Sequence, residues 1–210
     1  MDAEDRWTWL ARGRRDLADL LEPLTPQQWE WPSLCPGWRV RDVAAHVAMT
    51  PTEPTMAAIV TGMVRARGRL WDFGRDVAIS YAQARPPQEI VDVLRRDAEA
   101  RTMPPLTSAK NLLMDIYVHT QDIAVPLGLD VPVPTETGIA GFERVWTMSW
   151  PFWAKRRMRG LRLVATDAPV DVGSGEVVEG PLVALLLLVT GRTEAARDRL
   201  SRPGAANLAA

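Results

Sequence analysis

The chain has little of several features that would place it outside the cell or in a membrane. Only one of its 210 residues is cysteine, Cys35, so no disulfide can form within the chain, as is usual in a reducing compartment. The longest apolar run, Leu182 to Val189, is too short to cross a bilayer as a helix. The first residues are acidic and lack the basic-then-apolar order of a secretory signal. We therefore expect a cytoplasmic protein with no membrane partner.

An excess of charge of one sign is also missing. Lys and Arg total 25 against 26 Asp and Glu, which gives a formal net charge of −1. Because proteins that bind nucleic acids usually show a clear basic excess, we expect no nucleic-acid partner. The basic run at residues 155–159 follows Trp153, and in a neutral chain such a run is more typical of a solvated helix end.

Helical periodicity dominates the first 150 residues. Thr25, Pro26 and Gln28 form a helix-start signature, in which Thr25 caps the helix and Gln28 completes a capping box. Prolines separate the helical segments, and we expect Pro51 and Pro54 to interrupt or kink one long segment. Apolar residues recur at helical spacing over residues 5–22, about 38–82, 88–101, 108–126 and 135–150.

The pattern changes at Gly160. From there apolar residues alternate with their neighbours, as at Leu161 and Leu163, which is typical of a strand. Glycine-rich turns and a short apolar helix follow. We therefore expect a mainly α fold, with a bundle of four long helices in residues 1–155 and a small α/β domain in residues 160–210.

Histidine is scarce, so the positions of the two histidines carry information. His119 lies at the centre of the apolar stripe of its helix, between Ile116 and Ile123. Asp115 lies one turn earlier on the same face. A buried carboxylate and imidazole are costly unless they are paired or bound to a cation. This i, i+4 pair can place both side chains on one metal ion.

The second histidine, His46, lies at the flank of the apolar stripe of another helix, one turn after Asp42. Two inward-facing helices would thus bring His46, Asp115 and His119 to one point in a bundle core, where metal sites are often built. Three protein ligands leave one coordination position open, which is typical of a catalytic zinc. The alternative is that Asp115 and His119 form a hydrogen-bonded structural pair without metal.

Longer motifs carry a resemblance to a known family. Three blocks resemble the mycothiol-dependent maleylpyruvate isomerase family, a branch of the DinB-like metalloprotein superfamily, and together they cover nearly the whole chain. The blocks are Leu24–Trp29 with Pro32–Val47, Asp115–Ile123 with Pro126–Gly128, and Gly160–Asp167 with Glu179–Pro181 and Thr190–Arg192.

The resemblance implies a DinB-like four-helix bundle followed by a small C-terminal domain. It also implies a zinc ion held by a histidine of the second helix and an acid-xxx-His pair, positions that match His46, Asp115 and His119. In the isomerase that names the family the acid is glutamate, whereas Asp115 is one methylene shorter. Metal binding therefore transfers to this chain better than the isomerase reaction does.

The resemblance further implies a thiol co-substrate, mycothiol. A divalent metal, with zinc favoured, would hold that thiol as a thiolate near neutral pH. The thiolate would add to, or be transferred onto, a small electrophile. We therefore expect a thiol-dependent transferase or isomerase whose partners are a small-molecule thiol and an electrophile, and which is a monomer or a homodimer. The alternative from another class is a non-catalytic DinB-like module that binds a metal or a ligand.

Three further residues complete the hypothesis. Asp122, one turn after His119, would orient a metal ligand, although it is equally typical of a plain helix surface. Arg192 would bind a substrate anion, or would only complement a helix dipole. Cys35 is expected to be a packed small hydrophobe and not a nucleophile.

Overall fold

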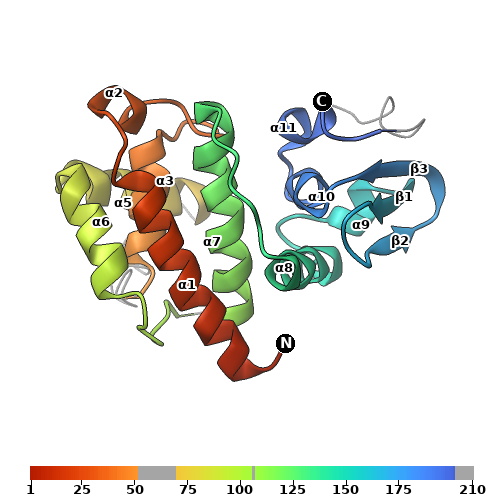
Figure 1. Cartoon of the computed structure of the whole chain (residues 1–210), viewed down its shortest axis with the longest axis horizontal. Helices are drawn as coiled ribbons and strands as arrows, with labels where there is room; N and C mark the ends of the chain where they lie inside the picture. Colours follow the sequence, from red (N-terminus) through yellow and green to blue (C-terminus); the bar gives the residue numbers. More distant parts are fainter. Residues whose placement is uncertain (52–69, 106, 202–210) are drawn as a thin grey trace. The chain divides into compact units, whose positions relative to one another are not determined.

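The computed structural model describes residues 1–51, 70–105 and 107–201, which separate into two compact units (Figure 1). The first unit runs from Asp2 to Val131 and the second begins at Pro132. The predicted interruption at Pro54, and most of the link between the helices on either side of it, lie outside the described residues.

Four helices of the first unit form a bundle. They are α1 (Ala3–Leu21), α3 (Val40–Met49), α6 (Pro87–Arg96) and α7 (Ala109–Ala124). Both α1 and α3 pack against α6 and α7, so the four helices surround one core, and α5 (Leu70–Gln83) packs on α3. The buried apolar side chains at its centre include Leu10, Leu17, Leu21, Val43, Ile90, Leu94, Leu113, Ile116 and Ile123.

Local capping sets where several of these helices begin. Asp2 caps α1 through a capping box with Asp5. The short helix α2 (Pro26–Trp29) has the predicted capping box, in which Thr25 and Gln28 bond to each other's backbone N–H groups. Ser108 accepts a hydrogen bond from the Asn111 backbone and so caps α7.

The second unit combines short helices with a small sheet. Strand β1 (Gly160–Ala165) lies between β2 (Asp171–Gly173), which is antiparallel to it, and β3 (Gly175–Gly180), which is parallel to it. Leu163 and Val178 lie side by side in this sheet and are both fully buried. The helices are α8 (Thr135–Thr147), α9 (Ala154–Arg157), α10 (Leu182–Val189) and α11 (Thr193–Arg197).

The predicted fold class is confirmed: a helical bundle is followed by a small α/β part, with a strand beginning at Gly160. The boundary between the units lies at Val131 and Pro132, whereas the sequence placed it between residues 155 and 160. Helix α8 groups with the second unit because it packs against α10. Within the described part of the chain, no helix is both long and apolar enough to span a membrane.

Candidate metal centre

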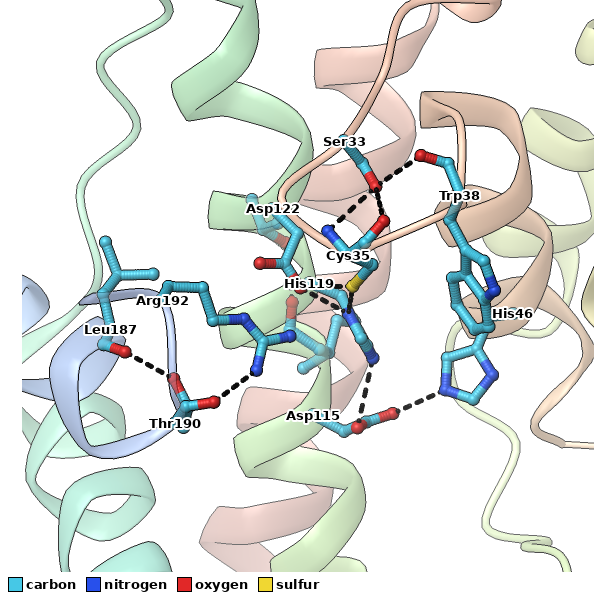
Figure 2. A network of polar contacts seen from close by, with 12 residues as sticks. Ser33, Cys35, Trp38, His46, Asp115, His119, Asp122, Leu187, Thr190 and Arg192 are labelled. Atoms are coloured by element: carbon cyan, nitrogen blue, oxygen red, sulfur yellow. Dashed lines mark hydrogen bonds and ion pairs between the residues drawn. The ribbon is translucent and has the colours of Figure 1, made fainter. Parts of the chain in front are cut away.

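Helices α3 and α7 carry the candidate site. Because α3 packs against α7, His46 of α3 faces Asp115 and His119 of α7 (Figure 2). Asp115, His119 and Asp122 follow one another at i, i+4 and i+7 along α7, so all three lie on one face of the helix.

Asp115 lies between the two imidazoles. Its Oδ2 is 3.1 Å from His46 Nε2, and its Oδ1 is 3.3 Å from His119 Nε2. One ligand atom from each of the three residues lies within 4.8 Å of the others. Ligand atoms bound tetrahedrally to one zinc ion lie about 3.3–3.5 Å apart, which is close to the two measured spacings. The sequence-predicted trio is therefore brought together by the fold.

The second ring nitrogen of His119, Nδ1, contacts Asp122 on the side away from Asp115. His119 Nδ1 is 2.8 Å from Asp122 Oδ2, and the Asp122 side chain is fully buried. A metal-bound histidine usually donates its second N–H group to such a carboxylate, which sets the ring orientation and leaves the first nitrogen free to bind. The complete burial of Asp122 rules out the alternative that it is a plain surface residue.

Charge is concentrated within this cluster. Burial by itself would raise the pKa of Asp115, but attraction to His119 and hydrogen bonds with His119 and His46 lower that pKa far below its ordinary range. Burial by itself would lower the pKa of His119, but attraction to Asp115 and hydrogen bonds with Asp115, Asp122 and Cys35 raise it well above its ordinary value. Without a metal, a proton on His119 thus compensates the Asp115 charge.

The cluster is open on one side. The side chains of His46 and Asp115 are 24% and 30% exposed, against 11% for His119. His46 Nδ1 is buried and has no hydrogen-bond partner among the described residues. Two imidazole nitrogens, a carboxylate and an exposed face suit a divalent cation that keeps a position for a further ligand. The residues present therefore fit zinc.

Trp38 forms an aromatic wall beside the cluster. Its ring centroid lies 5.3 Å from that of His46 and 6.2 Å from that of His119. Nothing in the sequence assigned Trp38 to the site. Trp38 precedes the first residue of α3, and no helical spacing connects it with His46 or with His119.

The Cys35 thiol also reaches the site. Cys35 Sγ lies 3.0 Å from Asp122 Oδ2 and 3.7 Å from His119 Nδ1. Cys35 is therefore not simply a packed small hydrophobe, as the sequence suggested, because its thiol makes polar contacts. Its loop crosses α7, where the Leu34 backbone N–H donates to the Asp122 carbonyl oxygen at 3.0 Å.

Arg192 belongs to the second unit. It follows α10 and directly precedes α11, and its guanidinium donates to the Thr190 carbonyl oxygen at 2.8 Å. The predicted contact between Arg192 and a substrate anion stays a prediction.

Comparison with solved structures shows a shared fold. A crystal structure of a histidine-to-alanine mutant of the mycothiol-dependent maleylpyruvate isomerase has a TM-score of 0.60 and 14% identity, over 98% of this chain and 94% of that chain. A second crystal structure of the mycothiol-dependent maleylpyruvate isomerase has a TM-score of 0.53 and 17% identity, over 91% and 90%. At such low identity the likeness concerns the fold alone.

Sequence comparison identifies the family. No curated protein matches the chain. The profile of the mycothiol maleylpyruvate isomerase N-terminal domain matches residues 10–124, which is more than half of the chain and includes both histidine helices. With the resemblance seen in the motifs thus confirmed, the chain belongs to the mycothiol maleylpyruvate isomerase N-terminal domain family.

Proposed function

We propose that the protein is a metal-dependent enzyme that activates a low-molecular-weight thiol, mycothiol, for addition to or transfer onto a small electrophile. Membership of the family supports the identity of the thiol. The single observation that carries the metal part is the convergence of His46, Asp115 and His119 within 4.8 Å, with one side exposed.

Each residue of the site would have its own role. His46, Asp115 and His119 would hold a divalent cation, with zinc favoured by two imidazoles and a carboxylate. Such a cation keeps a bound thiol deprotonated near neutral pH. Asp122 would orient the His119 ring, and Trp38 would exclude water from one side.

Position 115 is aspartate here, whereas the resemblance implies a glutamate at this position in the isomerase that names the family. The shorter Asp115 side chain still reaches both imidazoles, at 3.1 and 3.3 Å. Reach is therefore no obstacle to a shared metal ion. We propose a reaction like that of maleylpyruvate isomerase, with the electrophile to be found by screening, and a cytoplasmic monomer or homodimer.

Metal analysis combined with a thiol assay tests this proposal. The purified protein is expected to bind about one zinc ion per chain, and to consume maleylpyruvate or a related electrophile only when mycothiol is present. Asp115→Asn keeps the shape of the side chain but removes its charge, and should lose both properties. The matched control is Asp130→Asn, an exposed carboxylate outside the cluster, which should keep both.

Two outcomes would contradict the proposal. A parent protein that binds no divalent metal would support the hydrogen-bonded structural pair. A parent protein that binds zinc but turns over no electrophile with any thiol would support the non-catalytic metal-binding module.

A further inference from the structure

The Cys35 thiol and the His119 ring meet on one oxygen atom. Asp122 Oδ2 lies 3.0 Å from Cys35 Sγ and 2.8 Å from His119 Nδ1 (Figure 2). An ionised carboxylate only accepts hydrogen bonds, so Cys35 donates its S–H to Asp122, and a His119 ring that carries a proton on Nδ1 donates its N–H. The fully buried Asp122 side chain thus receives hydrogen bonds from two residues that are 84 positions apart.

The loop that carries Cys35 is anchored at the same place. The Leu34 backbone N–H donates to the Asp122 carbonyl oxygen at 3.0 Å. The Ser33 hydroxyl donates to the Trp38 carbonyl oxygen at 2.9 Å and accepts from the Cys35 backbone N–H at 3.1 Å. These bonds place the thiol over Asp122 independently of the thiol's own contact.

Cys35, His119 and Asp122 are also close enough together to suggest a second metal site. The distances favour hydrogen bonds instead. A sulfur and an oxygen bound to one zinc ion lie about 3.5 Å apart, and a nitrogen and an oxygen about 3.3 Å apart. The measured values are 3.0 and 2.8 Å, which are hydrogen-bond lengths.

We propose that Cys35 is a positioning residue: its thiol holds the Asp122 carboxylate in one rotation, and Asp122 in turn aims the His119 ring at the metal. The rotation of a carboxylate about its terminal bond is only weakly restricted by its own torsional preference. A second donor on Oδ2 therefore selects the rotation in which that oxygen faces His119 Nδ1. This inference rests on the proposed metal function of the cluster.

Zinc affinity of two Cys35 variants tests the role of the thiol. Cys35→Ala removes the donor, and is expected to weaken zinc binding about three- to tenfold. This loss is no larger than the smallest losses typical of residues that orient a metal ligand, because a thiol is a weak donor. Cys35→Ser restores a donor, and should recover most of the affinity. Competition with a chromophoric chelator at constant pH measures both.

A loop variant separates positioning from loop packing. Ser33→Ala removes the three hydrogen bonds of the Ser33 hydroxyl, two with the Cys35 backbone and one with the Trp38 carbonyl oxygen, and keeps the thiol. We expect it to lower the melting temperature while zinc affinity stays closer to that of the parent than in Cys35→Ala. Equal losses of affinity in Ser33→Ala, Cys35→Ala and Cys35→Ser would overturn the proposal in favour of a packing role.

A spectroscopic readout works with or without metal. The Nδ1–H proton of His119, followed by one-bond ¹H–¹⁵N correlation, should give a sharp signal in the parent and in Cys35→Ser. In Cys35→Ala it should broaden or exchange faster, because the accepting oxygen is less ordered. An unchanged signal together with unchanged zinc affinity in Cys35→Ala would refute the positioning role and leave the proposed function intact.

Metal counts distinguish the remaining cases. Two zinc ions per chain in the parent, falling to one in both Cys35 variants, would make Cys35 a ligand and overturn the proposal. A parent that binds no zinc but whose His119 signal depends on Cys35 would refute the proposed function, while the positioning contact would stand.

Discussion

Two sets of polar side chains in the first unit have opposite surroundings. Arg14 of α1 is 2% exposed, and its Nη1 atom donates to the carbonyl oxygens of Asp97, Ala98 and Ala100 at 3.2, 3.0 and 2.8 Å. These carbonyls follow the end of α6, where carbonyl groups lack partners within the helix. The candidate metal site instead consists of side chains that face one another (Figure 2) and are partly exposed to solvent.

This difference separates polar groups that serve the fold from those that serve a ligand. Burial lowers the pKa of Arg14 to about 10, and its partners are backbone carbonyl oxygens of the turn that follows α6. One nitrogen of His46 and one of His119 are directed at the Asp115 carboxylate. A cation bound to all three groups can therefore replace the proton shared between the imidazoles and the carboxylate. Mutations in the two places should therefore change different properties.

Replacing His119 should have the largest effect on function. His119→Ala removes one proposed ligand, and is expected to weaken zinc binding by more than about 100-fold, beyond the range for outer-shell partners, and to abolish thiol-dependent turnover. Because the buried Asp122 loses a donor, the free energy of unfolding of the metal-free protein should fall by about 1–3 kcal/mol. Zinc titration and denaturant unfolding measure these effects. A variant that keeps its zinc would contradict the ligand assignment.

Replacing Arg14 should have the reverse pattern. Arg14→Met removes the side-chain donor that three carbonyls share, and is expected to lower the free energy of unfolding by about 3 kcal/mol while zinc affinity stays unchanged. The control is Arg12→Met on the same helix, whose exposed ion pair with Asp16 should contribute about 0.5 kcal/mol or less. If Arg14→Met lost zinc affinity without losing stability, the contrast between the two places would fail.

The stabilising effect of zinc should grow with pH. The raised pKa of His119 means that its proton stabilises the metal-free fold fully below about pH 6.5, and that this contribution is lost as the pH rises through the folded value. Zinc needs the neutral ring, so it competes with that proton. The lowered pKa of Asp115 acts only at much lower pH: its stabilisation is present above about pH 3.8 and is lost as pH falls through the folded value.

Melting temperatures of zinc-loaded and metal-free protein from about pH 5.5 to about pH 8 test this competition. The difference in melting temperature between the two forms should increase with pH. The apparent zinc affinity behind it should rise by up to about tenfold per pH unit. A difference that shrinks as the pH rises would show that His119 is not a ligand in its neutral form.

Replacing Arg192 should have the smallest effect. If its guanidinium binds a substrate anion, Arg192→Gln should raise KM for an acidic electrophile about tenfold and leave the zinc content unchanged. Arg197→Gln, which changes a surface arginine paired with Glu194 in α11, is the matched control. Equal KM values for the two variants would assign Arg192 to the helix end alone.

Features that depend on neighbours along the chain were predictable from the sequence. The capping box of Thr25 and Gln28 spans one turn, and the i, i+4 relation of Asp115 and His119 follows from helix geometry. The change of period at Gly160 marks the first strand of the second unit. The position of His46 beside the apolar stripe of its helix placed it in the candidate site, the motif resemblance agreed, and the family assignment has been confirmed.

Features that depend on which segments meet were not predictable in this way. Arg14 reads as one more charged residue of an amphipathic helix until α1 packs against α6 and brings it to that helix's end. The grouping of α8 with α10 likewise follows from packing, because a helical pattern alone does not say which unit a helix joins.

The sequence by itself determined the type of fold and the family, and it singled out the residues proposed to bind a metal, because these depend on composition, local periodicity and motif. Only the tertiary structure decided that Cys35 and Trp38 join the site. Cys35 reaches Asp122 because its loop bonds to the backbone of α7, and Trp38 lies against His119 because α3 packs on that helix. Side-chain contacts between distant segments arise from packing, and the residue pattern within either segment does not predict them.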